Sequence, residues 1–321
     1  MECSWQFPWL PRLGSCFAGT IFALKRLACS RACFSVDETK ERTQIWQRRR
    51  RQLGAVEQAI ILGIIQGLTE FIPVSSSGHL VTIPRLFKWQ DLGLAFDVAC
   101  HWGTLVALIV YFRKDWAVML AGLLQHKTES SDLSGRLVLP IIVACAPAGL
   151  AGVVLGDKID SLRGWNWLVQ MVALVLIGVG LIMLLAERVG KKQRGISEMR
   201  WPDFLLIGVA QAFALVPGVS RSGITIATGL FLNLKRAAAA RFSFLLSTPI
   251  VFGAGLLELA KLIKTGVSWG ELGILGIGFL TSACSGFLAI AFLMRYLSKK
   301  PLDPFVTYRI CFGIFLLLAS Q

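Results

Sequence analysis

Long apolar segments alternate with short charged stretches along most of this chain. Six segments are long enough for a helix that crosses a bilayer, which needs ~20 apolar residues. They cover about residues 93–112, 137–156, 167–187, 242–263, 271–294 and 303–320. The pattern therefore predicts an all-α polytopic membrane protein with about six transmembrane helices.

Two further apolar segments, about residues 57–83 and 203–232, are interrupted by polar residues. The first contains QGLTEFIPVSSSGH, from Gln66 to His79, and the second contains QAFALVPGVSRSG, from Gln211 to Gly223. A shift of 145 residues places Gln66 on Gln211, and it also aligns a Val-Ser-x-Ser-Gly run in both copies. We therefore expect a duplicated fold with halves at about residues 57–187 and 203–320.

Composition supports the membrane class and excludes others. The 321 residues are 55% hydrophobic and 16% charged, with a mean hydropathy of +0.65, and a soluble domain could not bury so much apolar surface. The net charge of +14 is typical of basic cytoplasmic loops. Since no basic patch is interleaved with aromatic residues, we expect no nucleic-acid partner. The eight cysteines follow neither metal-ligand nor disulfide spacing.

The distribution of basic residues predicts the topology. Most lysines and arginines between the predicted spans fall on one side, which is therefore assigned as cytoplasmic; the others are Arg85, Lys88, Lys158, Arg163 and Lys264. This assignment requires segment 203–232 to enter and leave on the cytoplasmic side. Because three predicted spans separate the copies, segment 57–83 would be re-entrant from the outside. The prediction is an inverted repeat with two re-entrant broken-helix hairpins.

Residues 1–54 differ from the rest of the chain. They contain no apolar run long enough to span a bilayer and end near the basic run Arg48–Arg51. They are either a targeting or membrane-surface extension or the product of an over-long start, and the second is favoured. We expect them to be dispensable beside a membrane domain at residues 55–321. A re-entrant first segment would leave the arginine run outside, whereas a full span would place it inside, so both topologies stay open.

The first motif combines a carboxylate, hydroxyls and a histidine. Glu70 follows Gln66 by one helical turn, so both project from one face. Pro73 ends that helix, a serine-rich bend follows, and His79 opens the return segment. A carboxylate at membrane depth is costly and usually faces a cavity, where it binds a cation, a proton or a basic partner. The alternatives are a structural carboxylate and a packed histidine.

The second motif has the features of an anion-binding turn. Pro217 and Gly218 interrupt the helix, and a new helix is expected to begin near Arg221. A helix N-terminus offers free N–H groups, serine hydroxyls add donors, and an arginine fork suits phosphate oxygens. The alternative is that Arg221 pairs with Glu70 and joins the halves; a ligand could also replace that pair. His101, one turn after Asp97, is assigned either to packing or to the surroundings of the site.

The stretches QGLTEFIPVSSSGH and PGVSRSGIT resemble the signature motifs of the undecaprenyl-diphosphate phosphatase family of the bacitracin-resistance type. The similarity runs from about residue 57 to the C-terminus. It implies catalytic roles for Glu70, Ser76, His79 and Arg221, with Glu70 and Gln66 as metal ligands. The implied phosphate-binding residues are Ser75, Ser77, Ser220, Arg221, Ser222, Gly223 and Thr225. Some members carry glutamate where this chain has Gln66, which cannot act as a base.

The resemblance also implies the activity: hydrolysis of undecaprenyl diphosphate to undecaprenyl phosphate and inorganic phosphate. This reaction recycles the lipid carrier for peptidoglycan and other cell-wall polymers and confers bacitracin resistance. The implied cofactor is a divalent cation, Mg²⁺ or alternatively Ca²⁺, and the nucleophile is Ser76, His79 or water. The expected setting is the bacterial inner membrane, with the site open to the outer face, bilayer lipids as neighbours and a homodimer as an option. The alternative is a lipid-phosphate or small-anion transporter.

Overall fold

The computed structural model describes residues 54–89, 91–125, 135–162, 167–265 and 272–320. The chain divides into two units, Met1–Gly54 and Ala55–Gln321, and the elements below belong to the second, apart from Gly54 at the start of the first helix. The predicted N-terminal extension lies outside the described residues, apart from Gly54.

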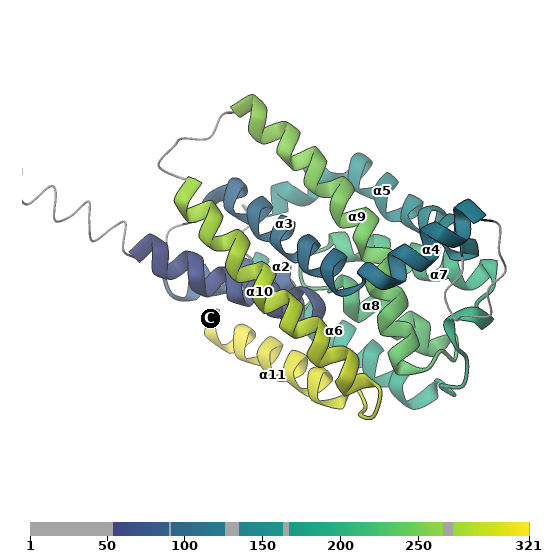
Figure 1. Cartoon of the computed structure of the whole chain (residues 1–321). Coiled ribbons are helices and arrows are strands. Elements are labelled where there is room, and N and C mark those ends of the chain that lie inside the picture. The colour runs from purple at the N-terminus through teal and green to yellow at the C-terminus, as the bar shows by residue number, and fades with distance from the viewer. Residues whose placement is uncertain (1–53, 90, 126–134, 163–166, 266–271, 321) are drawn as a thin grey trace, which may run out of the picture. The chain divides into compact units, whose positions relative to one another are not determined.

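The second unit is a bundle of helices (Figure 1). The described part of the first helix covers residues 54–71. The later helices are α2 (Ser76–Leu86), α3 (Gly93–Tyr111), α4 (Arg113–Gln125), α5 (Val138–Ser161), α6 (Leu168–Val189), α7 (Trp201–Ala212), α8 (Arg221–Phe231), α9 (Arg236–Thr265), α10 (Leu272–Leu297) and α11 (Asp303–Ala319). Short 3₁₀ turns cover Gly135–Leu137, Ile196–Glu198 and Phe213–Leu215. Within the described ranges the only β pairing is an isolated bridge between Arg194 and Leu234, so the all-α prediction is confirmed.

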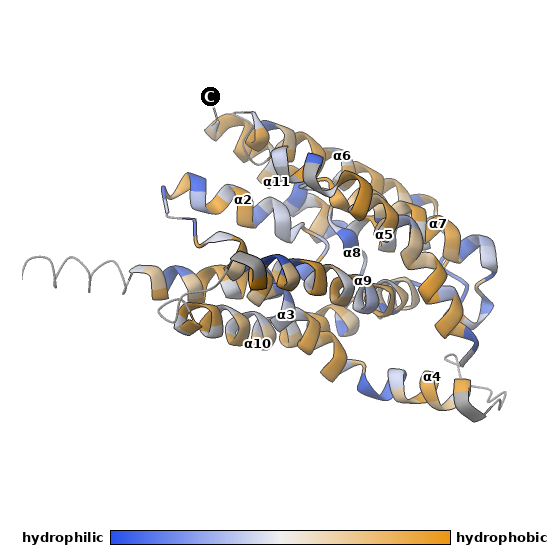
Figure 2. Cartoon of the chain, turned by 90° about the horizontal axis from the view of Figure 1, so that it is seen from above, coloured by the Kyte–Doolittle hydropathy of each residue, from blue (hydrophilic) through white to orange (hydrophobic). Residues whose placement is uncertain are grey.

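Five of the described helices are long and apolar enough to cross a membrane. They are Gly93–Tyr111, Gly135–Gly156, Leu168–Val189, Arg236–Ile263 and Leu272–Leu297. Figure 2 shows hydrophobic residues along most of their length, and the outward side chains of Leu150, Val153 and Ile263 are at least two-thirds exposed. Such apolar surface is suited to lipid, and the chain is a multi-pass membrane protein. The sixth predicted span is present as α11, but it has only 17 residues.

Both predicted interruptions are present, and their geometry repeats. Helices α2 and α8 each have 11 residues and begin 145 positions apart, at Ser76 and Arg221. The residue before each is a serine with positive φ, 79° at Ser75 and 70° at Ser220. Each serine side chain accepts a hydrogen bond from the backbone N–H three residues later. The duplication seen in the sequence is therefore also a duplication of backbone conformation.

Each broken segment returns to the end of the bundle from which it came. Ile83 near the end of α2 belongs to the same apolar cluster as Ala59 near the start of the first helix. In the second segment Arg194 bonds both sides of the hairpin. Its Nη2 donates to Asp203 near the start of α7 at 2.6 Å, and its Nη1 donates to the carbonyl of Leu232 after α8 at 3.0 Å. Both segments are therefore helical hairpins.

The two hairpins return to opposite ends of the bundle. The long helix α10 begins at the first hairpin, where Ile274 packs in the cluster of Ala59. Beyond the other end of α10, the backbone N–H of Leu302 donates to Glu187, which also pairs with Arg236 just after the second hairpin. Figure 2 accordingly shows α2 and α7 on opposite sides of the centre. This opposite direction is what an inverted repeat predicts.

The first helix packs closely on α10 because small residues line the contact. A Cβ atom built on Gly67 would lie 2.5 Å from the backbone oxygen of Ser282 and 2.6 Å from the backbone nitrogen of Gly286. Next to it, the Ser282 hydroxyl donates to the carbonyl of Cys100 on α3 at 2.9 Å. The position of the helix that carries the first motif therefore depends on a residue without a side chain.

We expect Gly67→Ala to lower the melting temperature of the detergent-purified protein by about 3–10 °C, because the added methyl group must separate two helix backbones. The control is Gly178→Ala on α6, where a Cβ atom would meet nothing within 4 Å. That variant should melt at or slightly above the wild-type temperature, since alanine favours helix over glycine. Equal melting temperatures for Gly67→Ala and wild type would show that the contact is not close.

Candidate functional site

The site is built on the two serine-capped turns. A positive φ is uncommon for a residue other than glycine and is retained where the surroundings fix it. Here the cap bonds fix it: the N–H of Gly78 donates to Ser75 at 3.3 Å, and the N–H of Gly223 donates to Ser220 at 3.1 Å. The N–H of Gly218 in the second turn donates to the Ser77 hydroxyl at 3.4 Å. The N-termini of α2 and α8 therefore lie together.

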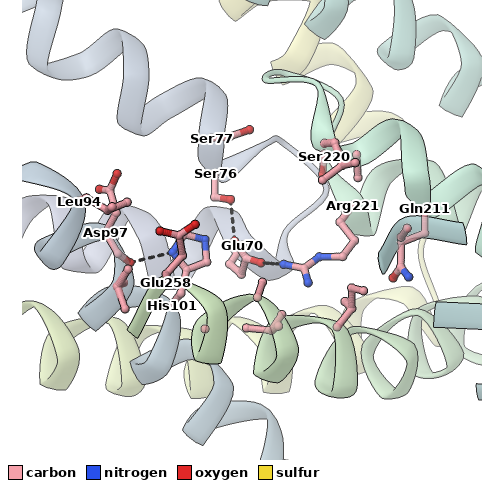
Figure 3. A pocket seen from close by; sticks show the side chains of 18 residues that line it. Glu70, Ser76, Ser77, Leu94, Asp97, His101, Gln211, Ser220, Arg221 and Glu258 are labelled. Atoms are coloured by element: carbon pink, nitrogen blue, oxygen red, sulfur yellow. Dashed lines mark hydrogen bonds and ion pairs between the residues drawn. The ribbon is translucent and has the colours of Figure 1, made fainter. Parts of the chain in front are cut away.

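Glu70 is the centre of the polar contacts at this junction (Figure 3). Its Oε2 accepts from Gln66 Nε2 at 3.0 Å and from the Ser76 hydroxyl at 2.6 Å. Its Oε1 forms an ion pair with Nη2 of Arg221, which comes from the other half of the chain. The side chains of Glu70 and Arg221 are 6% and 20% exposed. The expected alternative, an arginine that joins the halves through Glu70, is thus present in this structure.

A cavity of about 300 Å³ opens beside this pair. The polar motif residues on its wall are Glu70, Ser76, Ser77, Gln211, Ser220 and Arg221. Much of the remaining wall is apolar and comes from α3, α5 and α9; it includes Leu94, Val98, Ala148, Ile250, Val251 and Ala254. A mostly apolar cavity with a few convergent polar groups is the usual form of a ligand site. This one can hold an anion at Arg221 and an apolar chain beside it.

His79 is outside this cavity wall and has no free ring nitrogen. Its Nδ1 lies 2.6 Å from the carbonyl oxygen of Ser75, and its Nε2 lies 2.7 Å from the hydroxyl of Tyr308. Its ring also stacks on Phe312, with centroids 4.6 Å apart. These contacts support the first turn on the side away from the cavity. This arrangement corresponds to the packed-histidine alternative.

Four predicted phosphate-binding residues also lie behind the wall. Ser75 is fully buried, and Ser222 and Thr225 are almost so. Ser222 lies 3.2 Å from Ser220, hydroxyl to hydroxyl, and Thr225 bonds the Ser243 hydroxyl of α9 at 2.6 Å. With Gly223, these residues support the turn. Their binding to phosphate stays a prediction.

Three cavity residues outside the motifs received no firm role from the sequence. Asp97 and His101 lie on α3, and Glu258 lies on α9. Nδ1 of His101 lies 2.7 Å from the backbone carbonyl oxygen of Asp97. This contact joins the histidine side chain to the carbonyl group one helical turn earlier in α3. The available signal was the presence of ionisable residues within predicted spans, which usually face a cavity.

Arg309 on α11 was missed altogether, although it is an arginine within a predicted span. It is fully buried, and its guanidinium bonds backbone carbonyl groups of both turns. The acceptors include Pro73 at 3.4 Å, Gly218 at 2.8 Å and Val219 at 3.2 Å. Arg309 therefore fixes the two turns to each other.

The predicted metal ligands were Glu70 and Gln66. The described residues contain no group of three or more His, Cys, Asp or Glu side chains placed to hold a metal ion. Oε1 of Gln66 is nevertheless buried without a hydrogen-bond partner, close to the Glu70 carboxylate. Magnesium is often bound by one or two carboxylates together with substrate phosphates. Glu70 lines the cavity and fits that mode, in which the substrate completes the shell. Gln66 is fully buried and is not among the residues that line the cavity, so its role as a metal ligand stays a prediction.

Comparison with known proteins identifies the family. The model of the family described as "Bacitracin resistance protein BacA" matches residues 59–315. The chain belongs to this family. An undecaprenyl-diphosphatase from Thermomicrobium roseum is 46% identical over 271 residues, which is 82% of this chain and 97% of the relative. Another from Trichlorobacter lovleyi is 47% identical over 257 residues, covering 80% and 94%.

If the Glu70–Arg221 pair joins the halves of this BacA-family protein, removing one partner should destabilise it more than removing both. We expect Glu70→Gln and Arg221→Gln each to lower the melting temperature, and the double variant to recover part of the loss. The coupling should be about 1–3 kcal/mol. Thermal unfolding of the four proteins in detergent measures it.

The matched control is the more exposed pair Arg188–Asp303, whose side chains are 65% and 31% exposed. Its coupling should stay below about 1 kcal/mol. Additive effects of the Glu70 and Arg221 substitutions would contradict a structural role for their ion pair.

Proposed function

We propose that this chain hydrolyses undecaprenyl diphosphate to undecaprenyl phosphate and inorganic phosphate. The observation that supports it most directly is the convergence of Glu70, Ser76 and Arg221, from both halves, on one cavity with an apolar wall. The relatives named undecaprenyl-diphosphatase match over nearly their whole length. The reaction class is therefore phosphoric-anhydride hydrolysis on a lipid substrate.

Arg221 would bind the diphosphate by exchanging one acceptor for another. Its guanidinium now pairs with the Glu70 carboxylate. A phosphoryl group could accept hydrogen bonds from the same planar guanidinium through two oxygens, and it carries more negative charge than a carboxylate. The N-termini of α2 and α8 add the positive ends of two helix dipoles. Stabilisation of charge that develops on the phosphoryl oxygens would be the main source of catalysis.

Glu70 is placed to accept the proton of the nucleophile. The Ser76 hydroxyl already donates to it at 2.6 Å, which is the geometry of a nucleophile and its base. Ser76, or a water in its place, would attack the terminal phosphorus, and its proton would pass to Glu70. The bond from that phosphorus to the bridging oxygen would break, and the bridging oxygen would leave with the lipid phosphate. With water as the nucleophile this step releases inorganic phosphate directly. With Ser76 it leaves a phosphoserine, which a water would hydrolyse in a second displacement that releases inorganic phosphate and restores the serine hydroxyl.

His79 was expected to be catalytic, and its contacts support a different role. Both ring nitrogens already have partners, and the ring is not part of the described cavity wall. We therefore favour Ser76 or water as the nucleophile and His79 as a positioning residue. It would hold the Ser75 carbonyl and, through it, the turn that presents Ser76.

A divalent cation, Mg²⁺ or alternatively Ca²⁺, remains part of the proposal. Glu70 and Gln66 would hold it together with the diphosphate oxygens. When bound, the cation would neutralise charge on the diphosphate. Gln66 contributes no base, so Glu70 carries any proton transfer alone.

The membrane setting follows from the substrate. The apolar side chains of α3, α5 and α9 beside Arg221 suit an isoprenoid tail. We place the protein in the bacterial inner membrane with the site open to the outer face, where it would recycle the carrier for cell-wall polymers and confer bacitracin resistance. Association as a homodimer stays a prediction of the sequence.

A lipid-phosphate or small-anion transporter is the second candidate. Its support is the pair of oppositely directed hairpins that meet at the anion site, which is an architecture of transporters. The names of the relatives favour the hydrolase.

The test is phosphate release from farnesyl or undecaprenyl diphosphate by the purified protein in detergent with Mg²⁺. We expect release by the wild type and a loss of about 100-fold or more in Arg221→Lys, because lysine keeps the charge but not the two-pronged contact. The control Arg295→Lys, at an exposed position near the end of α10, should leave the rate unchanged.

Two outcomes would count against the proposal. Wild-type activity in Arg221→Lys would show that the site requires only a positive charge at this position and not the two-pronged guanidinium contact. Transport of a lipid phosphate or anion into liposomes, without phosphate release in detergent, would favour the transporter.

A further inference from the structure

Gln211 is a buried polar residue at the cavity, and its side-chain amide makes no hydrogen bond that would explain its burial. It lies in the last turn of α7, is 2% exposed and is part of the cavity wall. Neither the nitrogen nor the oxygen of its side-chain amide has a hydrogen-bond partner among the described residues. In the view of Figure 3 it lies on the side of Arg221 away from Glu70, and both residues line the cavity. Because a buried unpaired amide is destabilising by about 1–3 kcal/mol, a native protein that retains one calls for an explanation.

The repeat supplies a direct comparison. Gln66 occupies the equivalent position in the first hairpin and donates to Glu70, one turn later on the same helix face. One turn after Gln211 the chain has Leu215, which is apolar and also lines the cavity. The second copy therefore retains the amide but has no carboxylate to receive its hydrogen bond. The partner of Gln211 has to come from outside the motif.

The chemistry of the neighbouring groups indicates what that partner is. Arg221 supplies the cationic group of the cavity wall that Gln211 shares, and the Ser220 hydroxyl and the N-terminus of α8 add donors. A ligand bound among these groups is an anion rich in oxygen acceptors. A diphosphate has more oxygen atoms than one guanidinium can contact, and a neutral amide donates hydrogen bonds without adding a titratable group.

We propose that Gln211 is a substrate-binding residue whose side-chain N–H donates to a phosphoryl oxygen of the diphosphate, beside the oxygens bound by Arg221. This inference rests on the proposed hydrolase function and extends its site to α7. Gln211 takes no part in proton transfer, since an amide is neither acid nor base at neutral pH. Its contribution is to affinity and to the placement of the diphosphate.

Gln211→Leu tests this inference, because leucine has a similar size and lacks the amide. We expect kcat/KM for farnesyl diphosphate to fall roughly 10- to 100-fold, the usual effect of losing a hydrogen bond to a charged group. We also expect the ligand-free protein to melt at the same or a higher temperature, because the substitution removes an amide that has no partner. A merely structural glutamine would not give this combination.

A second variant and a binding measurement complete the experiment. Gln211→Met keeps an unbranched side chain and replaces Gln211→Leu as the test if the leucine variant fails to fold; the same loss in kcat/KM is expected. Inorganic pyrophosphate should raise the melting temperature of the wild type clearly more than that of either variant. Val209→Leu, a half-exposed position on the same helix, is the matched control and should leave kinetics and the pyrophosphate shift unchanged.

Wild-type kcat/KM together with a wild-type pyrophosphate shift in Gln211→Leu would overturn the inference. A lower melting temperature with unchanged kinetics would overturn it in favour of a packing role. Failure of the proposed function is distinguishable: the wild type would then release no phosphate, while the pyrophosphate shift would still report on Gln211.

Discussion

The ion pair between Glu70 and Arg221 is the contact on which the rest of the site depends. Each charge lies in an interrupted segment of a membrane protein, where an isolated charge would be strongly unfavourable, and each is supplied by a different half of the chain. The pair requires both turns to lie together. Arg309 meets this requirement from a third helix by bonding the carbonyl groups of Pro73 and Gly218. The two oppositely directed hairpins therefore bring a carboxylate and a guanidinium to one point.

The same contact prepares the site for a diphosphate. Arg221 is held by a carboxylate that a phosphoryl group could replace, and Glu70 already accepts a hydrogen bond from the Ser76 hydroxyl. Ligand binding would then free the carboxylate that the chemistry needs. The apolar wall from α3, α5 and α9 extends the site toward the lipid part of the substrate. On this proposal one interaction would stabilise the resting protein and would be exchanged when the diphosphate binds.

Local signals in the sequence predicted most of the helices and their interruptions. The contacts between helices depend on tertiary structure, and most of them were not predicted. Segment length and polar interruptions predicted five of the spans and the two interrupted segments, and the pairing of Glu70 with Arg221 was an alternative that the motifs left open. The length of α11, the packing of His79 on Tyr308 and Phe312, and the bonds of Arg309 were not predictable. Which face of a helix meets the cavity depends on its neighbours, and the motif alone contains no information about α3 or α9.

The most direct test of this account is an experimental structure of the protein bound to a diphosphate analogue with a methylene bridge in place of the bridging oxygen. The account predicts the terminal phosphonate in the cavity, with the Arg221 guanidinium on its oxygens and the Glu70 carboxylate released from that pair and facing the nucleophile. An analogue bound elsewhere, with the Glu70–Arg221 pair intact, would contradict it.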